Sequence, residues 1–351
     1  MHDPSASKRI ILDCLLSDAE RKSANETSFF DAIQSLDIAE CAAFARGLNM
    51  SPQLYAEISR VPSLKEYAAA IFVDCTLQEQ YTDALHQSLS QLNRALGKSS
   101  FDLVPLKGIS LWGSVYERPS QRICRDLDLL IDSSENIIPA CDVIKDLGYE
   151  YQGSNLHDDI ADKDRYELQE FVAERPIPDG MYEVLGRGHR FLFPGIDEVT
   201  TRDSTIWVRL ELHKAPFLYE DASHPAIDCS DLKNHPLYPR MKHLPLAFSV
   251  GYLAMKFVQD TEELLKGDLV KTKSFKLLHD TRLILSVLDR RSKAEAVELA
   301  NKYGTAPYLR AVLSILMPLN LAKKWTGIEL EETDWLLDAY TASPDPVSSL
   351  A

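Results

Sequence analysis

Two short segments of the chain alternate between apolar and polar residues with a period of two. Residues 126–131 (DLDLLI) place leucines on one side and Asp126 and Asp128 together on the other. Residues 207–213 (WVRLELH) repeat the pattern, with valine and leucine opposite arginine, glutamate and histidine. This period is typical of β-strands with one buried face, so both segments are predicted strands. Short apolar runs predict further strands at 103–106, 149–151 and 189–194.

Apolar residues at helical spacing dominate the chain on both sides of these strands. They predict helices at 28–36, 38–48, from 51, 63–96, 136–147, 246–265, 275–288, 293–303 and 307–319, with Gly148 ending the helix 136–147. We therefore predict an α+β fold, in which a mixed β-sheet core carries helical N-terminal and C-terminal regions. The N-terminal helices fit either a layer packed on the sheet or a partner-binding module. The expected domains are a helical region at 1–100, the sheet core at 101–240, a helical region at 241–340 and a flexible tail at 341–351.

The composition is that of an ordinary globular protein of the cytoplasm. Of the 351 residues, 45% are hydrophobic and 26% are charged, and no apolar run approaches the roughly 20 residues of a membrane span. The six cysteines include no Cys-x-x-Cys pair, which argues against a zinc site and indicates reduced thiols. We therefore expect a cytoplasmic protein without membrane contact. The net charge of −15 disfavours a broad RNA or DNA footprint, although a local basic patch is compatible with RNA.

The acid pair in residues 126–131 is the first candidate for chemistry. Two carboxylates side by side repel each other, and burying them is costly unless protons or a cation compensate. Mg²⁺ or Mn²⁺ is a common solution, because both ions accept hard oxygen ligands. Glu211, on the polar side of its strand, is a candidate third acid. The alternatives are a solvated acidic surface for Asp126 and Asp128, and a surface pair with Arg209 or Lys214 for Glu211.

A phosphate-binding turn is predicted upstream of the acids. An apolar run ends in Lys107-Gly108, and Ser110 and a second apolar stretch follow. This order predicts a strand, a tight turn and the start of a helix. Lysine and a helix N-terminus both favour a bound anion such as a triphosphate, and glycine lets the backbone approach it closely. Arg122 and Arg125 flank the acid pair, and Arg122 fits either an ion pair with these acids or a phosphate contact.

At these positions the chain resembles a known family. The resemblance is firmest over 103–150, thinner over 205–215 and loose over 244–288. The chain departs from the family at Ile109, where glycine or serine is common, and at Cys124, where a small hydroxyl residue is common. The family is the uncharacterised nucleotidyltransferase family of the polymerase-beta-like superfamily, and the motifs that carry the likeness are Lys107-Gly108, Arg122, Asp126-x-Asp128, Gly148-Tyr149 and Glu211-Leu212-His213.

The resemblance implies a nucleotidyltransferase catalytic core and an enzyme that uses an NTP as co-substrate. Asp126, Asp128 and Glu211 would be the catalytic residues, as ligands of two divalent ions, Mg²⁺ or Mn²⁺. The nucleotide-binding candidates are Lys107, Gly108, Ser110, Arg122 and His213. For His213, which shares a strand face with Glu211, a structural hydrogen bond is an equal alternative.

The favoured function is transfer of a nucleoside monophosphate from an NTP to a hydroxyl group of a small molecule, peptide or protein. One alternative is an RNA-directed enzyme, such as a toxin that modifies tRNA ends, and the negative net charge disfavours it. A catalytically silent nucleotide-binding protein is another, which the intact set of acids argues against. The polar segment 153–188 fits either a lid or a surface excursion, and the lysine-rich segment 266–276 either a triphosphate contact or a solvated face.

Overall fold

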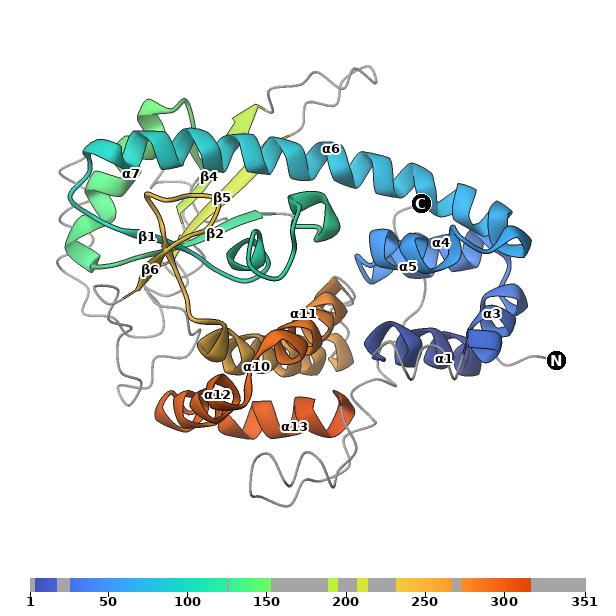
Figure 1. The fold of residues 1–351 in the computed structure, drawn as a ribbon. Coiled ribbons are helices and arrows are strands. Elements are labelled where there is room, and N and C mark those ends of the chain that lie inside the picture. Colours follow the sequence, from blue (N-terminus) through green and yellow to red (C-terminus); the bar gives the residue numbers. More distant parts are fainter. Residues whose placement is uncertain are drawn as a thin grey trace. The chain divides into compact units, whose positions relative to one another are not determined.

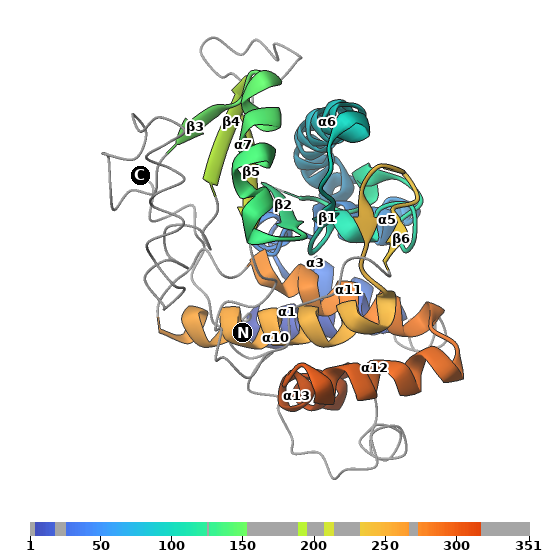
Figure 2. The same ribbon diagram turned by 90° about the vertical axis from the view of Figure 1, so that its left-hand side faces the viewer.

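The chain folds into two compact units. The computed structural model describes residues 4–17, 26–124, 126–152, 189–194, 207–213, 232–266 and 273–316. Residues 79–245 form the sheet unit, which contains the β-strands, and residues 1–78 with 246–351 form the helical unit (Figures 1 and 2). The predicted loop at 153–188, the tail at 341–351 and residues 267–272 of the lysine-rich segment lie outside the described residues. No helix in the described part of the chain is long and apolar enough to cross a membrane.

A mixed five-stranded sheet forms the core of the sheet unit. Its strands follow the order β1-β2-β5-β4-β3, in which β2 and β5 run parallel and the other neighbours antiparallel. This arrangement confirms the predicted α+β fold with a mixed sheet. The strands are β1 Leu103–Pro105, β2 Asp126–Ile131, β3 Glu150–Gln152, β4 His189–Pro194 and β5 Trp207–His213, and a separate two-stranded sheet pairs β6 Lys233–Asn234 with β7 Lys242–His243.

The parallel pairing of β2 with β5 determines where the acids lie. Its register places Asp126 opposite Arg209 and Asp128 opposite Glu211. Side chains at paired positions project from the same face of a sheet, so the carboxylates of Asp128 and Glu211 lie side by side. The alternate positions of both strands are buried apolar residues, namely Leu127, Leu129, Ile131, Val208, Leu210 and Leu212.

The part of helix α6, Lys65–Ala95, that belongs to the sheet unit and helix α7, Ile137–Asp146, lie along one face of this sheet (Figures 1 and 2). Helix α6 begins in the helical unit and ends in the sheet unit. Its last turns are attached to the segment between β6 and β7, where the backbone N–H of Arg240 donates to Oδ1 of Asn93 over 2.8 Å. Helix α7 ends as predicted, because Gly148 has a φ of +91°, in the left-handed region that favours glycine.

The helical unit is organised around α10, Leu246–Leu265, which is buried along most of its length. Helix α10 packs against α11, α12 and α13. Gly251 allows a close approach in this core, because a Cβ at this position would lie 2.5 Å from Oγ1 of Thr305. The remaining helices are α1 Pro4–Leu16, α3 Glu26–Ser35, α4 Ile38–Gly47, α5 Ser51–Ile58, α11 Phe275–Val287, α12 Arg290–Lys302 and α13 Ala306–Leu316. Short 3₁₀ turns are η1 Pro62–Leu64, η2 Leu96–Lys98, η4 Pro119–Gln121 and η5 Ser134–Asn136.

The prediction that a helix starts after Gly108 is wrong. A single 3₁₀ turn, η3, covers Ile109–Leu111, and Trp112 that follows it is extended. Gly113 then adopts a φ of +78°, and its N–H donates to the carbonyl of Tyr116 over 2.7 Å, so the chain reverses direction. The apolar residues that suggested a helix instead fill the core as a compact loop. This turn therefore presents no α-helix N-terminus to an anion.

Candidate active site

Three side chains from adjacent strands form the centre of the candidate site. Asp128 on β2 and Glu211 and His213 on β5 each offer a ligand atom, and these atoms all lie within 4.8 Å of one another. Asp128 is only 1% exposed and His213 is 8% exposed. Asp126, two residues before Asp128 on β2, is half-buried, and its negative charge acts on the Glu211 carboxyl. The alternation of β2 and β5 predicted this shared face, and the register brings the side chains together.

Asp128 is held as an anion by two donors that share one of its oxygens. The Lys107 ammonium donates to Oδ1 of Asp128 over 2.6 Å, and Nε2 of His213 lies 2.9 Å from the same oxygen. An ionised carboxylate can only accept hydrogen bonds, so Nε2 carries the proton in this contact. Burial alone would raise the pKa of the Asp128 carboxyl, but Lys107 and then His213 outweigh burial and lower that pKa well below its usual range. Asp128 is therefore charged at neutral pH.

The pKa of the Glu211 carboxyl is shifted in the opposite direction. Burial, followed by the charges of Asp128 and Asp126, raises the pKa of the Glu211 carboxyl above its usual value. Lys107 and His213 lower that pKa but do not cancel these effects. The surroundings of Glu211 therefore disfavour its negative charge, and a cation bound between Glu211 and Asp128 would relieve their repulsion.

The turn after β1 directs Lys107 at the acids. Lys107 itself, and not Gly108, adopts a left-handed conformation, with a φ of +52°. Such a conformation costs a non-glycine residue roughly 1–3 kcal/mol and tends to occur at functional sites. Two hydrogen bonds stabilise it: the Ser110 hydroxyl donates to the Lys107 carbonyl over 2.6 Å, and the Leu106 N–H donates to the Asp128 carbonyl over 2.9 Å. The hydroxyl of Ser110 therefore donates its hydrogen bond within the turn.

Gly108 is required by a close approach of Arg122. A Cβ at Gly108 would lie between 2.6 and 2.9 Å from three atoms of the Arg122 guanidinium. Arg122 is 2% exposed, and its Nη1 donates to the carbonyl of Ile123 and to Sγ of Cys124. The guanidinium therefore packs beneath the turn and supports its shape. Arg125, the other predicted flanking arginine, lies outside the described residues.

Two histidines that the sequence did not single out support the same turn. Nε2 of His243 donates to the Ser110 carbonyl over 2.8 Å, and Nε2 of His235 lies 3.4 Å from the Ile109 carbonyl. Burial, and then the neighbouring His243, lowers the pKa of His235 to about 4, so His235 is neutral at pH 7. Both histidines lie more than 120 positions beyond their partners, and no local pattern in the sequence indicated these contacts.

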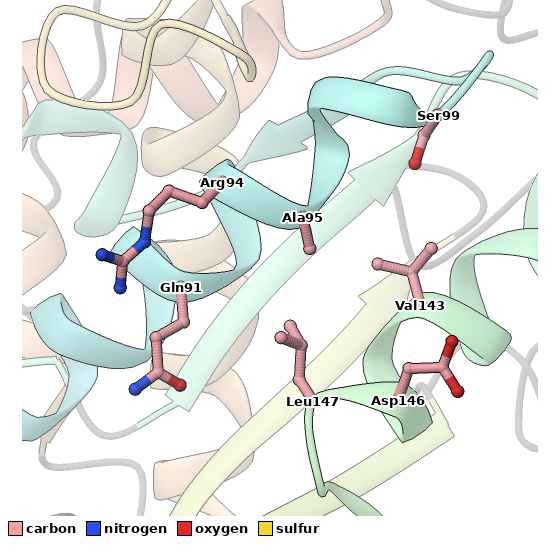
Figure 3. Close-up of a pocket in the computed structure, with 7 residues that line it drawn as sticks. All are labelled: Gln91, Arg94, Ala95, Ser99, Val143, Asp146 and Leu147. Atoms are coloured by element: carbon pink, nitrogen blue, oxygen red, sulfur yellow. The ribbon is translucent and has the colours of Figure 1, made fainter.

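A pocket of about 610 Å³ lies elsewhere in the sheet unit, between α6 and α7 (Figure 3). It opens widely to solvent, and in Figure 3 the side chains of Arg94 and Asp146 lie on opposite sides of it. The lining residues are Gln91, Arg94, Ala95, Ser99, Val143, Asp146 and Leu147. None of them is a predicted site residue, so this hollow is not the acid site on β2 and β5.

The comparisons with known proteins agree with the resemblance noted in the sequence. No curated protein and no solved structure matches the chain. The model of one family, described as "Uncharacterised nucleotidyltransferase", matches residues 34–317. The match spans the whole sheet unit from residue 79 to 245 and large parts of the helical unit. The chain therefore belongs to the uncharacterised nucleotidyltransferase family.

Proposed function

We propose that the protein transfers a nucleoside monophosphate from an NTP to a hydroxyl group of a small molecule, peptide or protein, with the help of divalent metal ions. One observation carries the proposal. In a member of a nucleotidyltransferase family, the parallel register of β2 and β5 sets Asp128 directly opposite Glu211, beside a lysine that follows β1.

The donor set fits a divalent ion. Asp128 and Glu211 supply hard oxygen donors within 4.8 Å of each other, and Asp126 adds a third carboxylate on the strand of Asp128. We assign Asp126, Asp128 and Glu211 as the residues that hold Mg²⁺ or Mn²⁺. When bound, such ions supply Lewis acidity to the acceptor hydroxyl and neutralise the departing pyrophosphate.

The remaining residues act on the nucleotide and on protons. The Lys107 ammonium, which lies at the acids, would turn to the negatively charged phosphates of the NTP and compensate their charge. Gly108 gives the buried Arg122 guanidinium room against the turn, and Ser110 and Arg122 hold the shape of the turn that presents Lys107. Because its pKa is raised, the Glu211 carboxylate is the site acid best suited to accept the proton of the attacking hydroxyl.

The test is the appearance of covalently transferred label. The purified protein is incubated with each α-³²P NTP and Mg²⁺ or Mn²⁺, alone, with small-molecule and protein fractions of a cell extract, and with total RNA. Metal-dependent label in a small molecule or protein, lost in Asp128→Asn, supports the proposal. Label in RNA favours the RNA-directed alternative, which the net charge of −15 disfavours. Absence of label under all these conditions, despite NTP binding, favours a catalytically silent protein.

A further inference from the structure

We infer that His213 is itself a metal ligand, and that the site is built for a first-row transition ion of the Mn²⁺ type rather than for Mg²⁺. The inference rests on the proposed metal site and goes further by adding a nitrogen ligand and a metal preference. Nε2 of His213 lies 2.9 Å from Oδ1 of Asp128 and 3.8 Å from Oε2 of Glu211. The imidazole therefore faces both acids at once.

These separations suit three ligands of one ion. Donor atoms about 2.1 Å from a metal in octahedral geometry are roughly 3.0 Å apart when adjacent and roughly 4.2 Å apart when opposite. Nε2 of His213 lies 2.9 Å from the Asp128 oxygen, close to the separation of adjacent ligands, and 3.8 Å from the Glu211 oxygen, between the two separations; all three ligand atoms lie within 4.8 Å of one another. Side-chain movements on the order of 1 Å would bring the three ligand atoms onto a common ion.

The burial of His213 argues against a direct nucleotide contact. The residue is 8% exposed, so little of the ring is open to a phosphate or a base. In the described part of the chain, the charged groups near Nε2 include the two acids Asp128 and Glu211. Metal binding at Nε2 requires the neutral imidazole to carry its proton on Nδ1, so the hydrogen bond to Asp128 is replaced by ligation of the same ion by both groups. The proton on Nε2 is exchanged through solvent, so that the ring that binds the ion is neutral.

The nitrogen donor determines the metal preference. Mg²⁺ is bound chiefly by oxygen ligands, whereas imidazole is a good ligand for first-row transition ions. Mn²⁺ combines this tolerance of nitrogen with the affinity for carboxylates that Asp128 and Glu211 require. Replacing His213 should therefore weaken Mn²⁺ binding more than Mg²⁺ binding.

The experiment is pulsed electron paramagnetic resonance of Mn²⁺ bound to the full-length protein labelled with ¹⁵N-histidine. With this label, nitrogen atoms of an added NTP analogue cannot produce the signal. We expect a ¹⁵N coupling in wild type, its loss in His213→Gln, and its retention in His86→Gln. His86 is a matched control in the same unit, because its Nδ1 contacts the Tyr238 hydroxyl at 2.6 Å. Thermal melts of all variants show whether each is folded.

Metal titrations complete the test. We expect His213→Gln to weaken Mn²⁺ binding about tenfold or more, and Mg²⁺ binding less than about threefold. Mn²⁺ that binds wild type, is lost in Asp128→Asn and shows no histidine coupling would overturn the role of His213 while leaving the proposed metal site intact. Failure of wild type to bind Mn²⁺ with or without the nucleotide analogue would overturn the metal site itself.

Discussion

In the helical unit, the buried carboxylate of Asp260 lies 3.5 Å from the ammonium of Lys256, one turn away on α10, and also accepts a hydrogen bond from the Ser274 hydroxyl. In the sheet unit, by contrast, Asp126, Asp128 and Glu211 lie on the adjacent strands β2 and β5, and the pKa of the Glu211 carboxyl is raised. The carboxylate in the first region is paired with a cation within the fold, whereas the surroundings of Glu211 in the second disfavour its charge. The difference separates an acid that is paired within the fold from acids whose mutual repulsion a bound cation would relieve.

The largest expected effect on turnover follows from removing the charge of Glu211. Glu211→Gln preserves the shape of the side chain and abolishes its charge. We expect turnover to fall about 10³-fold, because an acid that binds metal and accepts a proton is lost. The melting temperature of the metal-free protein should not fall, because the fold disfavours the charge of Glu211. Steady-state kinetics and calorimetric melts measure both quantities; a clear loss of stability without loss of turnover would assign Glu211 to structure.

The matching change in the helical unit, Asp260→Asn, should lower stability and leave metal binding unchanged. Asp260→Asn leaves the ammonium of Lys256 buried without its carboxylate, and breaking such a pair costs about 3 kcal/mol. We expect the free energy of unfolding to fall by about that amount, as measured by urea denaturation. Mn²⁺ binding by the folded protein should stay unchanged. Loss of metal binding with unchanged stability would show that the two regions do not divide the tasks in this way.

The stability of the protein should depend on pH through His235, which supports the turn after β1. The pKa of His235 in the folded protein is about 4, below its ordinary value of 6.5, because the fold keeps the ring neutral. The unfolded chain therefore binds the proton first, and stability is lost as the pH falls from 6.5 to below 4. The difference corresponds to roughly 3 kcal/mol. The loss of unfolding free energy between pH 7 and pH 4 should be smaller in His235→Gln; an equal loss in both proteins would contradict the neutral state.

A smaller effect is expected at Lys107. Lys107→Ala should weaken NTP binding about tenfold while nucleoside binding changes little, because the lost contact is to phosphate. Lys145→Ala, an exposed lysine on α7, is the control that should leave both affinities unchanged. Lys107→Gly should be more stable than Lys107→Ala by about 1 kcal/mol, because glycine adopts the left-handed φ freely. Equal losses for NTP and nucleoside would indicate damage to the fold.

Local patterns in the sequence predicted most of the elements. The helices predicted at 38–48 and 246–265 and the strand 126–131 appear with nearly the same bounds, because each buries one face whose spacing can be read along the chain. Parity alone placed Glu211 on the polar face. The alternation pattern could not predict that β5 pairs with β2 in parallel register, because this pairing joins segments about 80 residues apart.

The parts that the sequence did not predict depend on distant contacts. His235 and His243 reach the turn from far along the chain, and the burial of Arg122 beneath Gly108 could not be read from its neighbours. The sequence also did not indicate the left-handed conformation of Lys107, because glycine adopts this conformation at lower cost than lysine. The apolar residues after Gly108 suggested a helix, but they fill a compact loop instead. Tertiary packing overrode local preference at each of these positions.

The most direct test of the central claim is calorimetric titration of Mn²⁺ into the protein saturated with a non-hydrolysable NTP analogue. Wild type should bind the ion, and Asp128→Ala should show no nucleotide-dependent binding, because the buried anion that faces Glu211, His213 and Lys107 is gone. Circular dichroism verifies that the variant is folded. Equal nucleotide-dependent binding of Mn²⁺ by wild type and a folded Asp128→Ala variant would contradict the assignment of β2 and β5 as the metal-binding centre.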